Sequence, residues 1–158
     1  MRRAISVHLR GHWPEDQAVD TVTLAYFDRH RRRIQLVADA GTAFLLDLPH
    51  AQHLAEGDGL ELDDGGYIRV RAASEPVIEI QAEDRASLLR ICWHLGNRHL
   101  PVQIVGEQLR IRADHVIAEM VIGLGGHLTR HDAAFDPETG AYSAGVHDHD
   151  RDGGHDHR

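Results

Sequence analysis

In the first half of the chain, apolar and polar residues alternate over short stretches, which is the spacing of strands with one buried face. The alternation is clear in VDTVTLAYFD and RRRIQLVADAG, and it continues in AFLLDLP, GLELDDGG and YIRVRA. Turns rich in glycine and aspartate separate the later stretches. Five or six short strands in about 70 residues predict a compact β-sandwich or barrel-like domain.

Three short segments of this half interrupt the alternation. The basic run RHRRR, Arg29–Arg33, lies between two predicted strands and is interpreted as a solvated hairpin turn rather than an anion site. The segment PHAQHLAEGD is predicted as a single turn or a short helix. AASEP, Ala72–Pro76, is predicted as a connector, because proline interrupts a strand ladder. We therefore expect a first, β-rich domain at residues 1–73.

The second half begins with a strand-like and then a helix-like pattern. The apolar stretch VIEIQA predicts a buried strand. Asp84 is then placed to cap a helix from about Arg85 to Leu95, whose apolar residues share one face. Gly96 and Asn97 are predicted to end that helix, since both residue types tolerate a positive φ.

The same alternation of strand and helix continues to the end of the domain. PVQIV and QLRIRA predict a hairpin. Asp114 is predicted to cap a helix, HVIAEMVIGL, that stops at Gly125-Gly126. HLTRHDAAF is predicted as the last strand. The order βαββαβ predicts a ferredoxin-like domain at residues 75–143, with four antiparallel strands and both helices on one face. The predicted fold class is therefore α+β: a small β domain, a ferredoxin-like domain and a His-rich tail at 144–158.

Composition narrows the classes of function. Of 158 residues, 42% are apolar and 27% charged, which predicts a folded protein, and a net charge of −8 disfavours nucleic acid as a partner. No apolar run approaches the roughly 18 residues of a membrane helix, and no apolar leader follows the basic start, so we expect a cytoplasmic protein. The single cysteine, Cys92, excludes an internal disulfide and a CxxC site. Without a GxSxG elbow or a phosphate-binding glycine loop, we predict that the protein is not an enzyme.

Histidine is the outlier, with 14 copies in the chain and four in its last twelve residues. The tail HDHDRDGGHDHR alternates imidazole and carboxylate groups, which are ligands for borderline divalent ions. From His147 onward no large apolar side chain occurs, so we expect the tail to be disordered without a ligand. The interleaved aspartates favour metal capture over a purification tag, and the predicted ligands are His147, His149, His155 and His157.

Two further histidines flank the turn in WHLGNRHLPVQ. His94 lies near the predicted helix C-terminus, where histidine interacts favourably with the helix dipole, and we interpret it as structural. His99 lies beyond the helix, before a Leu-Pro pair that fixes the chain as extended. One imidazole cannot form a metal site, so His99 needs a second copy across a two-fold axis, ligands from elsewhere in the fold, or the tail. The spacing alone leaves these alternatives open.

The segment GNRHLPVQ, with DHVIAEM, FDPETGAY and the His-rich C-terminus, resembles the UreE family of urease accessory proteins, which act as nickel metallochaperones. Its most specific element is Gly96-Asn97-Arg98-His99-x-Pro101. The resemblance implies a homodimer in which His99 of each subunit meets its mate to bind Ni(II), while tail histidines add ligands or ions. It also implies that the N-terminal domain is a peptide-binding module, and that nickel passes to a GTPase-containing assembly that activates urease.

Some members of that family carry additional histidines where this chain has IRADH. Only His115 remains there, either as a secondary metal ligand or as a residue of the second helix's first turn. His127 and His131 share one face of the last predicted strand and are interpreted as exposed strand residues.

The rival functions are a divalent-metal buffer acting through its tail, a peptide-binding adaptor, and a metal-dependent hydrolase. The hydrolase would need a closed three-histidine site, which the sequence does not assemble. Imidazole and carboxylate ligands suit Zn(II), Cu(II) and Ni(II) alike, so the preference for nickel rests on the resemblance.

Overall fold

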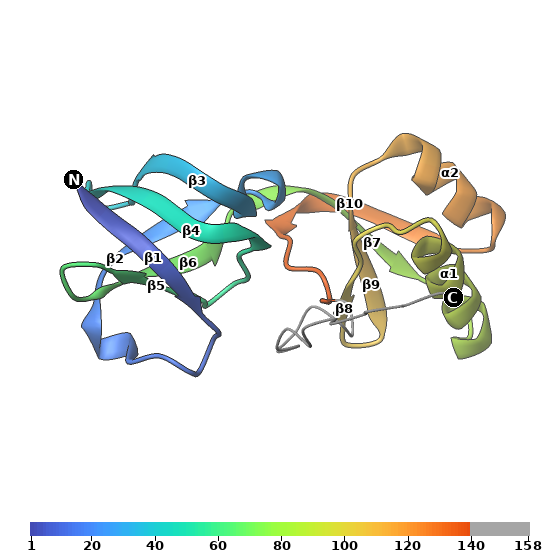
Figure 1. Cartoon of the computed structure of the whole chain (residues 1–158). Coiled ribbons are helices and arrows are strands. Elements are labelled where there is room, and N and C mark those ends of the chain that lie inside the picture. Colours follow the sequence, from blue (N-terminus) through green and yellow to red (C-terminus); the bar gives the residue numbers. More distant parts are fainter. Residues whose placement is uncertain (140–158) are drawn as a thin grey trace, which may run out of the picture.

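The computed structural model describes residues 1–139 as two sheets joined in sequence, the second of which carries two helices (Figure 1). The first sheet has the strand order β2-β6-β5-β1-β4-β3, in which β1 pairs with β4 and β2 with β6 in parallel and the other neighbours are antiparallel. Its strands are β1 (Arg2–His8), β2 (Ala18–Leu24), β3 (His30–Val37), β4 (Ala43–His53), β5 (Gly59–Leu62) and β6 (Tyr67–Ala72). Two short 3-10 helices, η1 (Glu15–Gln17) and η2 (Tyr26–Arg29), lie in the connections.

Alternation along these strands builds one buried core. Phe44, Leu46 and Leu48 of β4 are almost completely buried and pack with Leu60 and Ile68 of the neighbouring hairpin. The six strands agree in number with the prediction. One strand and one strand end differ from it. β1 was not expected, and residues 49–53 of the predicted turn or short helix continue β4, because β3 supplies them with a pairing partner.

The basic run is not a solvated turn. Arg29 ends η2 with no solvent exposure, and the next four residues begin β3. The Arg29 guanidinium donates to the carbonyl oxygens of Leu54 and Phe135 and to Oδ1 of Asp136. Both terminal nitrogens of this buried guanidinium are therefore paired, whereas its Nε has no hydrogen-bond partner within residues 1–139. The prediction failed because the acceptors belong to segments that are distant in the sequence.

The second sheet has the order β10-β7-β9-β8, with every neighbouring pair antiparallel. Its strands are β7 (Ser74–Gln81), β8 (Gln103–Val105), β9 (Gln108–Arg112) and β10 (His127–Ala134). Helix α1 (Arg85–Asn97) connects β7 to β8, and α2 (His115–Gly123) connects β9 to β10. Ile78 of β7, Ile91 and Leu95 of α1, and Ile117 and Val121 of α2 belong to one buried cluster, so both helices cover the same face of the sheet.

The predicted connector Ala72–Pro76 is almost absent. β6 ends at Ala72 and β7 begins at Ser74, so Pro76 lies inside a strand that has neighbours on both sides. Pro76 is tolerated because it lies near the start of β7. The pairing of β7 with β9 begins only at the next residue, Val77.

Polar and aromatic contacts join the two sheets. Tyr26 donates its backbone N–H to Oε2 of the buried Glu75 at 2.9 Å, and Arg112 Nε donates to Glu75 Oε1 at 2.7 Å. The Arg112 guanidinium also lies 4.0 Å from the ring centroid of Phe27. One carboxylate of the second sheet therefore ties η2 to β9.

Candidate metal centre

Helix α1 is built to end at a fixed point. Asp84 accepts a hydrogen bond from the Ser87 N–H at 2.7 Å and caps the first turn. The helix runs through Asn97, with Arg98 as the C-cap. Leu100 N then donates to Leu95 O at 3.2 Å and His99 N to Gly96 O at 3.0 Å. These two bonds are the pattern of a Schellman motif, which normally has glycine in the left-handed position.

In α1 that left-handed position is occupied by His99. Its φ is +58°, and it is the one non-glycine residue with a positive φ in residues 1–139. Gly96 and Asn97, which were expected to supply the positive φ, are helical instead. The prediction located the turn correctly but misplaced its left-handed residue by two positions, because the helix continues for half a turn beyond Leu95.

A histidine in this conformation has an energetic cost. A left-handed residue with a Cβ lies about 1–2 kcal/mol above the right-handed form, although histidine occurs there more often than most residues. Such strain persists only where the surrounding structure determines it, and it concentrates at functional sites. The imidazole of His99 is exposed to solvent, so no buried contact of that side chain explains the cost.

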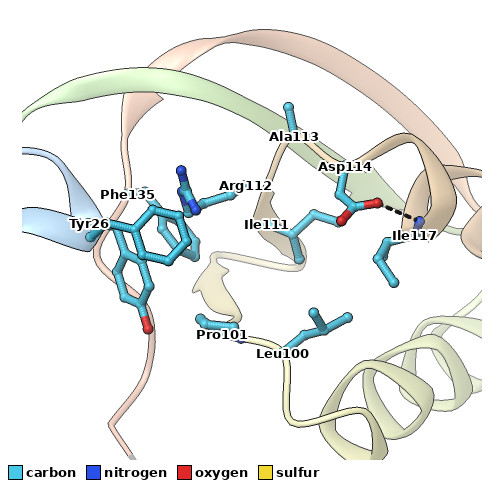
Figure 2. Close-up of a pocket in the computed structure, with 10 residues that line it drawn as sticks. Tyr26, Leu100, Pro101, Ile111, Arg112, Ala113, Asp114, Ile117 and Phe135 are labelled. Atoms are coloured by element: carbon cyan, nitrogen blue, oxygen red, sulfur yellow. Dashed lines mark hydrogen bonds between the residues drawn. The ribbon is translucent and has the colours of Figure 1, made fainter.

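The residues after His99 hold the turn from the other side. Leu100 packs against the cluster that contains Ile91 and Leu95, and Pro101 follows it. Figure 2 shows Leu100 and Pro101 on one side of a cavity of about 320 Å³, with Tyr26 and Phe135 on another side. The backbone that carries His99 is therefore fixed by helix α1 and by the junction between the sheets.

Next to this turn, α1 presents apolar side chains to solvent. Leu89 and Trp93, one helical turn apart, are each 63% exposed. His94 is half-buried in the last turn of the helix, and its ring meets the Trp93 indole edge-on, with centroids 5.0 Å apart. An exposed tryptophan and leucine on one helix are typical of a surface that another protein covers.

The remaining predicted or considered histidines of the second sheet have other surroundings. His115 is the exposed first residue of α2. On β10, His131 Nε2 lies 2.8 Å from Glu79 Oε1, and His127 Nε2 lies 3.8 Å from Glu83. Within residues 1–139 the fold brings together no group of three or more histidine, cysteine or acidic side chains that could hold a metal ion.

The tail ligands His147, His149, His155 and His157 lie outside the described residues, but the segment that leads to them is firmly anchored. Asp136 N donates to the Gln103 side chain at 3.0 Å, and Glu138 N donates to Val102 O at 2.8 Å. His147 follows Glu138 by nine positions in the sequence, which allows a span of up to about 30 Å between them. Val102, which accepts the bond from Glu138, is only three residues from His99. Sequence reasoning missed this anchor, because nothing in the sequence pairs Glu138 with Val102.

The chain is similar to known proteins over nearly its whole length. Residues 4–73 match the family model of the UreE urease accessory protein N-terminal domain, and residues 75–158 match that of its C-terminal domain. The chain belongs to the UreE family of urease accessory proteins. A UreE from Rhodopseudomonas palustris strain HaA2 is 56% identical over 143 residues, covering 90% of this chain and 66% of its own length. A second, from Chelativorans sp. strain BNC1, is 50% identical over 143 residues and covers 90% of both chains.

Membership of the UreE family confirms the resemblance of the GNRH segment. It also supports the prediction that the chain is not an enzyme, since the family and its relatives are named as accessory proteins of urease. In residues 1–139 no helix has the length and apolar character needed to cross a membrane.

Proposed function

We propose that this protein is a nickel metallochaperone that delivers Ni(II) to the urease activation complex from a site centred on His99. The observation that carries the proposal is the left-handed, solvent-exposed histidine at the end of α1, where glycine would relieve the backbone strain. A histidine held on ordered backbone offers one pre-positioned nitrogen ligand. Nickel(II) accepts imidazole nitrogen, and one such ligand per chain calls for a second chain.

We infer that the second ligand is His99 of another copy of the chain, in a homodimer with two-fold symmetry. Leu89 and Trp93 support this arrangement, because an apolar helix face one to three turns before His99 would be buried where two copies meet. An isologous contact there places each His99 near its own mate without further ligands from the sequence.

The tail is proposed to supply auxiliary ligands through His147, His149, His155 and His157, with His115 as a weaker secondary candidate. Support for the tail comes from its composition and from the anchor of Glu138 on Val102. A site made of a few exposed imidazoles releases its ion more readily than a closed four-ligand cage, which suits transfer to a partner.

The proposal also assigns the two domains, the receiving partner and the place of action. We class residues 75–143 as a ferredoxin-like domain on the element and strand order, and residues 1–73 as a peptide-binding-like domain that meets partners. The receiving partner is the urease accessory GTPase within the activation complex, and the place of action is the cytoplasm. The alternative function is a general buffer for Zn(II), Cu(II) and Ni(II), acting through the tail alone.

The deciding experiment removes the tail ligands and then His99. In the full chain, the four tail histidines are replaced by alanine, Ni(II) is titrated, and the mass of the species in solution is measured. We expect this variant to form a dimer that binds about one Ni(II). His99→Ala should abolish that binding, and His115→Ala should leave it intact. If the tail substitutions alone abolish all nickel binding, the protein is a tail-based buffer and the His99 site does not exist.

A further inference from the structure

We propose that the linking segment, residues 135–138, positions His99 for nickel binding and couples that position to the N-terminal domain. This inference rests on the function proposed above. The linking segment follows β10 and runs from the junction between the two sheets toward β8 (Figure 1). Its hydrogen bonds point in two directions, to the N-terminal domain and to the residues that follow the His99 turn.

The first two residues of the linking segment are held by the N-terminal domain. Arg29, whose side chain is fully buried, donates to the carbonyl oxygen of Phe135 and, through Nη1, to Asp136 Oδ1 at 3.4 Å. The backbone N–H of Glu56 donates to the same carboxylate oxygen at 3.2 Å. A buried guanidinium that loses its acceptors carries a large desolvation cost. The linking segment is therefore tied to the N-terminal domain and moves with it.

The other bonds of the linking segment reach the start of β8. The backbone N–H of Asp136 donates to Gln103 Oε1 at 3.0 Å, and that of Glu138 donates to the Val102 carbonyl at 2.8 Å. Val102 lies between α1 and β8 and belongs to neither element, so its carbonyl is held by neither a helix nor a strand ladder. The linking segment therefore supports the chain at the point where it leaves the turn.

A cavity interrupts the packing between the His99 turn and the N-terminal domain. Its volume is about 320 Å³. Leu100 and Pro101 line one side of it, and Tyr26 and Phe135 line another (Figure 2). Groups that face each other across a cavity lack the van der Waals contacts that would transmit a displacement. The hydrogen bonds of the linking segment therefore carry the connection between the N-terminal domain and the turn.

A metal site shared by two chains makes this positioning important. In the proposed dimer each chain contributes one His99 imidazole, so a shift of the turn occurs in both chains and adds up at the ion. The left-handed backbone of His99 also depends on the structure on both sides of it, because such a conformation persists only where its surroundings determine it. We therefore class Gln103 and Asp136 as positioning residues for nickel binding and not as ligands.

The test uses the full chain with alanine at the four tail histidines, so that nickel binding reports on His99. Gln103→Met removes the acceptor of the Asp136 N–H at similar side-chain length, whereas Gln103→Glu keeps an oxygen there. We expect Gln103→Met to lower the Ni(II) affinity about 10-fold, the lower end of what the loss of an outer-shell contact costs. Gln103→Glu should remain close to the parent. Asp136→Ala keeps the backbone N–H but removes the carboxylate, and should lower the affinity by a smaller factor.

Asp20→Asn is the matched control for a purely structural effect. Asp20 is buried in the N-terminal domain and accepts the backbone N–H groups of Thr21, Ala40 and Thr42. These contacts involve neither the linking segment nor the turn. Urea unfolding should show that Asp20→Asn destabilises the chain, while its Ni(II) affinity equals that of the parent. If Gln103→Met loses no more affinity than Asp20→Asn, its effect is structural and the inference is overturned.

Amide hydrogen exchange in the presence of a chelator tests the positioning without nickel. The Leu100 N–H is hydrogen-bonded within the His99 turn, and the Ser87 N–H is hydrogen-bonded at the other end of α1. In Gln103→Met we expect faster exchange at Leu100 and unchanged exchange at Ser87. If the parent binds no nickel, the function proposed above fails and this inference fails with it. If the parent binds nickel and Gln103→Met binds it as tightly, this inference alone is overturned, whatever the exchange rates.

Discussion

The two helices of the second sheet end in the same hydrogen-bonded turn but with different residues at its centre. At the end of α2, Gly126 N donates to Val121 O at 2.9 Å and Gly125 N to Ile122 O at 3.0 Å. At the end of α1, Leu100 and His99 make the equivalent bonds to Leu95 and Gly96. Both turns need a left-handed residue, which is Gly125 with φ +87° in one and His99 with φ +58° in the other.

Space does not explain the difference between the two helix ends. A Cβ added at Gly125 would have no neighbour within 4 Å, so the glycine of α2 serves only the backbone conformation. The same conformation in α1 carries an exposed imidazole instead. The α2 cap therefore serves the fold alone, whereas the α1 cap retains a costly side chain, which is consistent with a role for that side chain in binding.

The largest effect is expected from His99→Gly, which gives α1 the cap of α2. In the chain without tail histidines, Ni(II) affinity should fall at least about 100-fold, equivalent to about 2.7 kcal/mol. In the presence of a chelator, the free energy of unfolding should rise by about 0.5–1 kcal/mol, because the strain is relieved. Nickel titration and urea unfolding measure the two effects. A variant that loses both nickel and stability would mean that the left-handed turn is not strained at position 99.

The helix ends also show what the sequence could and could not predict. Asp84 and Asp114 were predicted as N-caps and both accept backbone N–H bonds, because capping depends on residues only two or three positions apart. The stop at Gly125 was predicted for the same local reason. The left-handed conformation of His99 was not predicted, since it depends on the packing of Leu100 into a core built from distant strands.

The junction between the sheets was the least predictable part of the fold. Arg29 was taken for a surface residue because it stands in a charged run, and its acceptors follow 25 and 106 positions later. Nothing local distinguishes it from the exposed Arg32 and Arg33. The same holds for His30 and His53, which lie opposite each other on β3 and β4 and which only strand register brings together. Local patterns therefore located the His99 turn, whereas contacts between distant segments determined its surroundings.

The reciprocal change, Gly125→His, should affect stability alone. It places a histidine in the α2 cap without the exposed Leu-Trp face that accompanies His99. We expect a loss of about 1–2 kcal/mol in the free energy of unfolding and no added nickel affinity. Gly123→Ala is the matched control, because Gly123 is helical and a Cβ there would have no neighbour within 4 Å. Alanine at this position should raise the free energy of unfolding by about 0.8–1 kcal/mol. Equal effects at 123 and 125 would contradict the conformational argument.

The smallest effect is expected at the N-terminus of α1, where the contribution of the Asp84 cap to stability depends on pH. Hydrogen bonds from the Ser87 N–H and hydroxyl, with a contribution from Arg90, lower the pKa of Asp84. The charged cap therefore stabilises fully above the unfolded-state pKa of about 3.9, and that contribution is lost as pH falls through the lower folded-state pKa. Asp84→Asn keeps a capping side chain that does not titrate, so the melting temperature of the variant should fall less steeply below pH 4 than that of the parent. If the melting temperatures of Asp84→Asn and the parent fall in parallel between pH 5 and 2, the charge of the Asp84 carboxylate does not contribute to stability.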